Sequence, residues 1–417
     1  MHQAGATSQP SVSRKASAVI HAGFVLIGVV TTMLGPLLPM LQAKWSLNDS
    51  QAGYLFTAQF ATSIIGTALL SEMIKRFGLL RSLAASYALM AVGAAGLGAG
   101  GWTLGIVAVS CYGFALGVAI PGTNILIAEM NPERRAARLN ILNFIWCAGA
   151  VACPAAVALF VREERIIAPL AGLAMLLAGI AALLVQYESF DQPGATGKKN
   201  RLAQSAARRG QESRAGASNF ASVWRSSFAY VIAALLFLYV GAENSIAGWV
   251  ATYTGRMNPS MASLGAWPQS IFWAAVLVGR LTAPVALRRL SEERLVLTAS
   301  LVSLLGASLL LITAQMSGLL IGAMLAGLGF AAIYPTTVAI FMKHYSDRAT
   351  ASAAPIFAMG ALGGATLPWV VGFVSTQLGS LRAGLLVPLI VNAAMIALEA
   401  VVIMMLVRAR ADADAKV

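Results

Sequence analysis

The sequence predicts an all-α membrane protein with twelve transmembrane helices, arranged as two pseudo-symmetric six-helix bundles. Three observations lead to this fold class: an apolar composition, twelve stretches long enough to cross a bilayer, and residues that recur in the second half. Of the 417 residues, 58% are hydrophobic and only 11% are charged, and the mean hydropathy is +0.76. An ordinary soluble protein has about 25% charged residues. The composition therefore excludes a soluble fold of this size, and it excludes disorder because so much apolar surface must be buried.

The twelve stretches each approach the roughly 20 residues that a helix needs to cross the hydrocarbon of a bilayer. In the first half they are residues 17–41, 52–73, 81–99, 103–129, 139–161 and 167–187. In the second half they are residues 227–254, 264–287, 294–313, 317–342, 350–376 and 382–407. They are too long and too uniformly apolar for barrel strands. The first stretch is also too long for a signal peptide, so we expect it to remain as the first helix.

Polar segments divide the chain into five parts. A tail at 1–16 precedes the N-terminal bundle at 17–187, and a tail at 408–417 follows the C-terminal bundle at 227–407. The linker between the bundles, 188–226, carries seven bases and three acids. We expect it to be a flexible cytoplasmic segment close to anionic headgroups, and we do not expect it to bind nucleic acid.

The distribution of Lys and Arg predicts the orientation. The chain has 29 of these bases and 16 acids, a net charge of +13. Arg280 lies within a span, 23 bases lie in segments that are cytoplasmic if the N-terminus is inside, and five lie in the outer loops. These five are Lys44, Arg162, Arg165, Arg256 and Arg382. The positive-inside rule then predicts a multi-pass protein of the cell (inner) membrane with both termini in the cytoplasm.

A repeat at a fixed offset relates the two halves. In the fourth and fifth spans and the segment between them the repeated residues are Gly113, Pro121, Arg134, Gly149 and Pro154. An offset of 214 finds the same residue types at Gly327, Pro335, Arg348, Gly363 and Pro368. Near the second and eighth spans an offset of 213 pairs Gly66 with Gly279 and Arg76 with Arg289. Halves related by a pseudo-two-fold axis place a binding site at their interface near the bilayer midplane.

The segment between the second and third spans carries a family signature. The stretch Ser71–Arg81 corresponds to the pattern Gly-x-x-x-Asp-Arg-x-Gly-Arg/Lys, in which Arg76 and Gly78 match. Ser71 replaces the first Gly and Lys75 replaces the Asp. With twelve spans and the repeat, the whole chain resembles the major facilitator superfamily. The resemblance implies alternating access by two bundles that rock about a central site.

Two further stretches resemble the fucose-permease-like sugar symporters within that superfamily. The run Gly241–Ser245, followed by Trp249 and Tyr253, is similar to their seventh helix, and Leu139–Phe144 is similar to their fifth. Those symporters often use acids in the first and fourth helices for proton coupling. Here the first span has no acid and the fourth has only Glu129, so their coupling site cannot be carried over.

Glu243 is the predicted ion-coupling residue. Only Glu243 and Glu399 among the 16 acids lie well inside spans, where a charge costs at least about 2.5–3.5 kcal/mol and indicates function. Glu243 lies roughly 22 Å along its helix from Phe228, a little beyond the midplane. The alternative is a protonated Glu that only joins helices. For Glu399, on the peripheral twelfth helix, the structural interpretation is preferred.

Donors, acceptors and flat aromatic faces predict a site for a neutral, hydroxyl-rich solute. The predicted contacts are Tyr239, Asn244, Trp249, Gln59, Asn124, Asn143, Trp146, Gln269, Trp273 and Tyr334, and Trp369 and Asn392 are further polar or aromatic candidates. No Lys or Arg other than Arg280 lies within a span, which weakens the case for a carboxylate or phosphate solute. Amides also join membrane helices and Trp also anchors them at interfaces, so a structural role stays open for each.

Five charged residues are predicted to form a cytoplasmic gate. They are Arg76, Arg81, Glu129, Arg280 and Lys343. Glu129 and Lys343 have opposite charges at positions that match under the 214 offset, although Lys343 also has Asp347 one turn away. Arg280 lies near the inner end of its span, where extension to the headgroups is the alternative to a gate ion pair.

Several classes of protein are not supported. There is no Walker A sequence, no histidine pair with metal-ligand spacing and no nucleophile–base constellation, so we expect no enzyme, no cofactor and no metal. The predicted function is secondary transport of a small neutral solute, with a monosaccharide expected, coupled to H⁺ or Na⁺ by a monomer in the bilayer. A drug/proton antiporter is the first alternative, although Ser110 and Cys111 stand where such proteins usually carry Arg. An uncoupled receptor or lipid-handling protein is the second.

Overall fold

The computed structural model describes residues 14–160, 166–190, 220–259, 264–346 and 352–414. Within these ranges the chain is helical and contains no strand. Eleven helices are long and apolar enough to cross a membrane, and one bent pair adds a twelfth span. The predicted fold class is confirmed. Most of the predicted linker, 191–219, lies outside the described residues, as do Asp347 and Arg348.

The helices follow the predicted spans closely. In the first half they are α1 (Arg14–Thr32), α2 (Leu34–Trp45), α3 (Asp49–Phe77), α4 (Leu79–Ala99), α5 (Trp102–Met130), the 3₁₀ turn η1 (Pro132–Arg134), α6 (Arg135–Phe160) and α7 (Ile167–Phe190). In the second half they are α9 (Ser227–Met257), α10 (Trp267–Ala286), α11 (Glu292–Ile312), α12 (Met316–Tyr345), α14 (Ala354–Leu378), α15 (Leu381–Gly384) and α16 (Leu386–Asp414).

The first span, predicted over 17–41, is formed by two helices and not by one continuous helix. It bends by 46° between α1 and α2. Pro36 has no backbone N–H, so it cannot donate to the carbonyl of Thr32 four residues earlier, and its ring crowds that carbonyl. The α-helical ladder is therefore interrupted at this point, as proline kinks require.

The repeated glycines mark where helices cross within each half. A Cβ at Gly149 of α6 would overlap the backbone oxygen of Val25 in α1. Its counterpart, Gly363 of α14, stands in the same relation to the backbone oxygen of Phe237 in α9. Only glycine allows the two backbones to approach so closely. The sequence repeat is therefore a repeat of helix packing.

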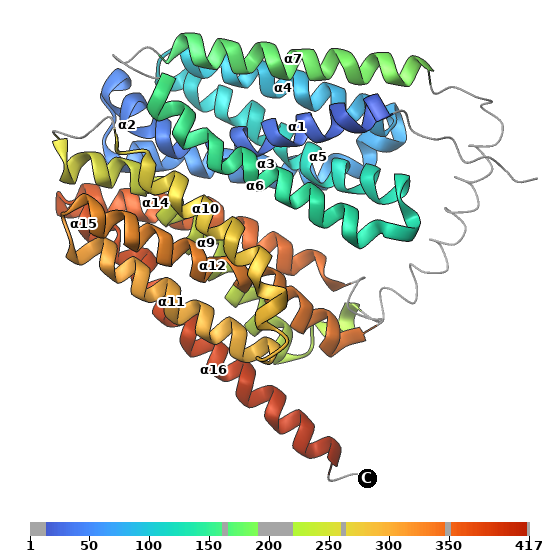
Figure 1. Cartoon of the computed structure of the whole chain (residues 1–417), viewed down its shortest axis with the longest axis vertical. Helices are drawn as coiled ribbons and strands as arrows, with labels where there is room; N and C mark the ends of the chain where they lie inside the picture. Colours follow the sequence, from blue (N-terminus) through green and yellow to red (C-terminus); the bar gives the residue numbers. More distant parts are fainter. Residues whose placement is uncertain (1–13, 161–165, 191–219, 260–263, 347–351, 415–417) are drawn as a thin grey trace, which may run out of the picture.

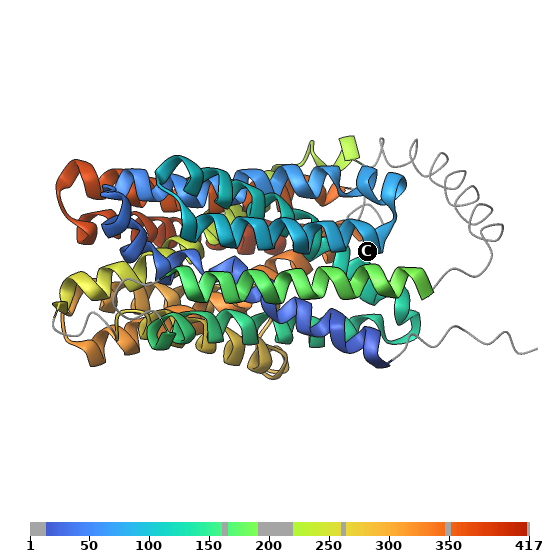
Figure 2. The ribbon, with the colours of Figure 1, turned by 90° about the horizontal axis from the view of Figure 1, so that it is seen from above.

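The two halves form separate groups of helices. Figure 1 shows the first-half helices, blue to green, on one side and the second-half helices, yellow to red, on the other; Figure 2 shows that most of them run along one common direction. The groups meet where α3 packs on α14, α6 on α10 and α2 on α9. The first two pairings are exchanged by the repeat, since α3 corresponds to α10 and α6 to α14.

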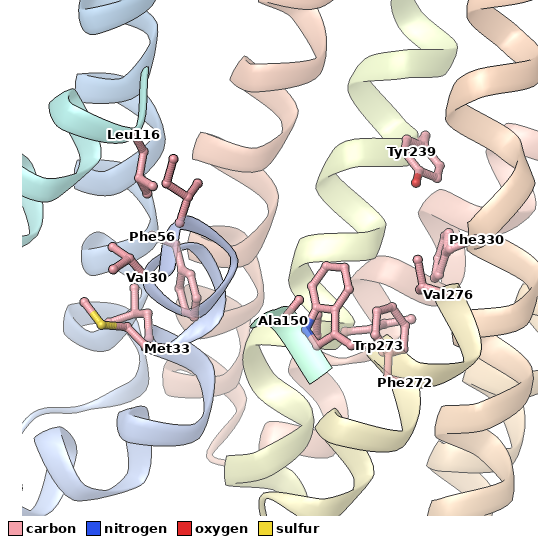
Figure 3. Packing of buried hydrophobic residues seen from close by; sticks show 14 of the residues in the cluster. Val30, Met33, Phe56, Leu116, Ala150, Tyr239, Phe272, Trp273, Val276 and Phe330 are labelled. Atoms are coloured by element: carbon pink, nitrogen blue, oxygen red, sulfur yellow. The ribbon is translucent and has the colours of Figure 1, made fainter. Parts of the chain in front are cut away.

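Apolar cores fill both sides of this interface. Figure 3 shows Val30, Met33 and Leu116 on the first-half side and Phe272 and Phe330 on the second-half side. All five are buried. The bundle has two ends. At the Asp49 end α3 begins and α9 and α14 end, and at the Phe77 end α3 ends and α4 begins.

Candidate functional site

A cavity of about 320 Å³ lies between the two halves. Its walls come from the α1–α2 break and from α3, α6, α9, α10, α12 and α14. The volume falls within the range of sites for small molecules. Its place at the interface agrees with the site that the pseudo-two-fold repeat predicts.

The α1–α2 break contributes backbone carbonyls to this region. Gln59 of α3 donates through Nε2 to the carbonyl of Thr31 at 3.1 Å. Gln269 of α10 donates to the carbonyl of Thr32, which Pro36 leaves without its helical partner, at 3.3 Å. Gln59 and Gln269 therefore anchor the broken helix to both halves. Among the described residues the Oε1 of Gln269 has no hydrogen-bond partner.

Glu243 and Tyr239 form a hydrogen-bonded pair on the cavity wall. Both lie on one face of α9, one turn apart, and the Oη of Tyr239 donates to Oε1 of Glu243 at 2.7 Å. Glu243 is 7% exposed. The ring of Tyr334 from α12 lies 5.9 Å from that of Tyr239. The pair gives the cavity one carboxyl group with a fixed donor.

Arg280 also lines the cavity, whereas the sequence predicted it near the inner end of its span, in a cytoplasmic gate or extended to the headgroups. Side chains of a helix tilt toward its N-terminus, and α10 begins at the Asp49 end, so Arg280 points back toward the centre of the molecule. Its Nη1 lies 3.4 Å from the Sγ of Cys147, and its guanidinium lies over the ring of Trp146 at 5.9 Å. The base that the sequence assigned to a gate is thus part of the central site.

Two tryptophans from different halves meet beside Arg280. The rings of Trp146 on α6 and Trp273 on α10 are 5.6 Å apart and nearly perpendicular, at 86°. Trp273 is buried, and its indole N–H has no acceptor among the described residues. The site therefore combines an aromatic wall, amide groups, one acid and one base.

Seven of the ten predicted solute contacts line this cavity. They are Gln59, Trp146, Tyr239, Asn244, Gln269, Trp273 and Tyr334. Trp249 is not among them, because it is buried and donates to the backbone carbonyl of Pro368 at 2.9 Å. Asn124 is half-buried on α5 away from the lining, and Asn143 is exposed on α6.

The further polar candidates from the sequence also lie elsewhere. Trp369 packs against Tyr54 with ring centres 5.7 Å apart. Asn392 pairs with Ser303. Glu399 accepts a hydrogen bond from Ser300 on α11 at 2.5 Å, so it joins two helices away from the cavity.

The other predicted gate residues lie at the Phe77 end. Arg76 pairs with Glu72 within α3 at 2.6 Å. Lys343 of α12 lies 3.5 Å from Glu292 of α11, where the sequence predicted Glu129 as its partner; Asp347, the other predicted partner, lies outside the described residues. Glu129 is exposed at the end of α5.

Arg81 completes the predicted gate set. It is exposed in the first turns of α4, close to the end of α3. The signature segment therefore places its bases at one end of the molecule, outside the cavity.

A network at the Asp49 end escaped the sequence analysis. The carboxylate of Asp49 accepts from Arg256 at 2.6 and 2.8 Å, from Gln42 at 2.7 Å and from Ser375 at 2.5 Å. Asp49 and Gln42 belong to the first half, whereas Arg256 and Ser375 belong to the second. Asp49 lies between the predicted spans 17–41 and 52–73, where no functional residue was predicted. The sequence does contain a signal for this pair. Asp49 follows the Asn48 cap at the start of an apolar helix, and Arg256 lies in a loop predicted on the same, outer side of the membrane.

Neighbouring contacts extend this closure along α3 and α14. The backbone N–H of Ser50 donates to Oγ1 of Thr376 at 2.8 Å. About two turns deeper along α3, Thr57 donates through Oγ1 to the carbonyl of Ala365 at 2.6 Å. Backbone and side chains of the two halves are therefore joined from Asp49 down to the cavity.

Comparison with known proteins gives a consistent picture of the fold. The nucleoside transporter NupG superposes with a TM-score of 0.71 at 15% identity, over 93% of this chain and 97% of that chain. A D-xylose–proton symporter gives 0.70 at 15% identity, over 92% and 96%. A point variant of the E. coli fucose:proton symporter FucP gives 0.58 at 18% identity, over 93% and 98%. No curated protein matches the sequence.

Residues 20–354 match the family described as the Major Facilitator Superfamily. This match covers most of the chain, and it agrees with the arrangement of helices, the repeat and the cavity between the halves. The members of this family are transporters and not enzymes. The chain is therefore a membrane transporter of the Major Facilitator Superfamily.

Proposed function

We propose that this protein is a secondary active transporter that carries a small hydroxyl-rich solute of the monosaccharide class, coupled to H⁺ through Glu243. The observation that carries the proposal is the Glu243–Tyr239 pair on the wall of the central cavity. A carboxyl group there can exchange a proton with the cavity while it contacts the solute. A Na⁺-coupled transporter is a weaker candidate, because a sodium ion needs several oxygen ligands around one point and the described residues offer one carboxylate.

The solute class follows from the cavity lining. Asn244, Gln269 and Gln59 supply amide groups, and the Trp146–Trp273 pair supplies an apolar face against which a sugar ring can pack. The similar structures are named as transporters of nucleosides, xylose and fucose, all hydroxyl-rich molecules. These features favour a sugar-like solute over the hydrophobic cations expected of a drug/proton antiporter.

The transport cycle requires the cavity to face each side in turn. In the proposed orientation both termini and the Phe77 end are cytoplasmic, in the inner membrane, and the Asp49 end faces outside. The two bundles, 17–187 and 227–407, rock as units in a monomer. The Asp49 network then holds the outer side closed in the state described here.

The expectation of a neutral solute loses its basis. It depended on Arg280 being the only Lys or Arg within a span, and on its predicted place near the inner end of that span, in a gate or extended to the headgroups. Because Arg280 lines the cavity, the charge of the solute has to be argued again from the site.

The test is transport in proteoliposomes with a panel of labelled sugars. Glu243→Gln retains size and hydrogen bonding but removes the exchangeable proton. We expect the variant to lose gradient-driven accumulation while it retains exchange of solute between the two sides. Glu399→Gln is the matched control, since Glu399 is a buried acid away from the cavity, and we expect it to accumulate solute normally. Normal accumulation by Glu243→Gln at every pH would refute the coupling role.

A further inference from the structure

Arg280 has few acceptors among the residues that surround it. Its guanidinium carries five N–H donors. In the described part of the chain its contacts are the Sγ of Cys147, a weak acceptor at 3.4 Å, and the face of Trp146. Among the described residues, the ion pairs within 4 Å involve bases other than Arg280. A guanidinium in the membrane interior requires an anion or water, and here it lines the solute cavity.

Glu243 shares the cavity with Arg280 without bonding to it. Its carboxyl group accepts from Tyr239 on its own helix. Glu243 lies on α9 and Arg280 on α10, and both side chains line the same space. The carboxylate of Glu243 can therefore neutralise the net charge of the cavity without forming hydrogen bonds to Arg280. The N–H groups of the planar guanidinium remain able to donate to another acceptor.

We infer that the transported solute carries a carboxylate that binds Arg280, and hence that it is a sugar acid. This inference rests on the proposed function and narrows its solute class. A guanidinium matches a carboxylate with two parallel hydrogen bonds. Trp146 and Trp273 beside Arg280 then receive the ring or carbon chain, and Asn244 and Gln269 lie on the walls that its hydroxyls face.

The charges of the cavity favour a monocarboxylate over a phosphate ester. When Glu243 is ionised and Arg280 is cationic, the charges of these two side chains sum to zero. A bound monocarboxylate adds one negative charge, which one proton on Glu243 cancels. A phosphate dianion would leave one negative charge uncompensated even then, and such a charge is costly within a membrane. The cavity that holds one monocarboxylate solute and one proton on Glu243 is therefore electrically neutral.

The experiment measures proton-driven uptake by proteoliposomes of three labelled probes of similar size: D-glucuronate, its neutral amide D-glucuronamide, and D-glucose. We expect D-glucuronate to be taken up at least tenfold faster than D-glucuronamide. Arg280→Gln should reduce this carboxylate-over-amide preference by about 10- to 100-fold, as expected for a lost charged hydrogen bond. Arg280→Lys should restore part of it, because the charge remains while the fork is lost.

A matched control separates the site from general charge effects. Arg288→Gln removes one exposed base from the turn that follows the end of the same helix, and it should leave the preference unchanged. Proton-driven uptake of D-glucose with no uptake of D-glucuronate would overturn the inference and leave the proposed function standing. Equal uptake of the acid and its amide, or a preference that survives Arg280→Gln, would also overturn it. Uptake of none of a wider panel of sugars and sugar acids would count against the proposed function itself.

Discussion

The two ends of the interface between the halves are joined in different ways. At the Asp49 end the polar contacts cross between the halves, as Asp49 with Arg256 and Ser50 with Thr376 show. At the Phe77 end the pair of Glu72 with Arg76 lies within one helix, and the pair of Lys343 with Glu292 joins two helices of the second half. A movement of one half against the other must break the first set of contacts, whereas the second set moves with its own half.

The two ends also differ in how far their acidic side chains are exposed to solvent. The side chain of Asp49 is 9% exposed, and it is surrounded by donors from three other residues. The side chains of Glu72 and Arg76 are 48% and 69% exposed. The side chain of Arg256 is 44% exposed, so the buried member of this pair is Asp49. Loss of its donors leaves a buried carboxylate without compensation, while exposed pairs contribute little. The Asp49 end should therefore respond far more strongly to mutation.

The largest effect should come from a covalent link across the Asp49 end. Ser50→Cys with Thr376→Cys places two thiols on neighbouring positions of α3 and α14. Oxidation, or a short bifunctional thiol reagent, should abolish transport, because the halves can no longer separate there. Reductant should restore transport after disulfide formation. Each single variant, Ser50→Cys or Thr376→Cys, is the control and should remain active under the same treatment; loss of transport in a single variant would mean that the treatment itself is harmful.

A smaller effect is expected when the Asp49 network is weakened without a link. Asp49→Asn removes the charge that Arg256 neutralises and shifts the two-state equilibrium toward opening at this end by about 1.5–3 kcal/mol, the value of a charged hydrogen bond. The measurement is labelling of Ala247→Cys, a cavity position, by an impermeant thiol reagent applied from the Asp49 end. The labelling rate should rise about tenfold or more. An unchanged rate would show that apolar packing of α3 on α14 holds this end closed.

The smallest effect is expected at the Phe77 end. Glu72→Gln breaks an exposed pair between residues one turn apart, for which about 0.3–0.5 kcal/mol is typical. Transport should change by less than twofold, and labelling of Ala247→Cys from the Asp49 end should not change. A large loss of transport would show that Glu72 contacts the second half in another state of the cycle.

The sequence predicted the cavity more completely than it predicted the ends. Tyr239 and Glu243 are four residues apart on a helix, so their contact follows from helical geometry alone. Trp249 lies on the same helix, but its side chain packs toward α14, and no spacing in the sequence indicates which neighbour covers that face. Arg280 reaches deeper than its position near the inner end of the span indicates, because its side chain tilts toward the N-terminus of its helix and enters the cavity.

The sequence by itself determined the number of spans, their lengths and the duplication. The thickness of hydrocarbon imposes runs of about 20 apolar residues, and each helix satisfies its own backbone hydrogen bonds. Only the tertiary structure decided that Asp49 meets Arg256, that Gln269 meets the carbonyl left free by Pro36, and that Arg280 joins the cavity. These contacts join helices more than 200 residues apart in the chain, or depend on how a side chain is aimed at a neighbouring helix. The local periodicity of the sequence does not indicate which distant helices meet or toward which neighbour a side chain points, because these depend on how one half packs against the other.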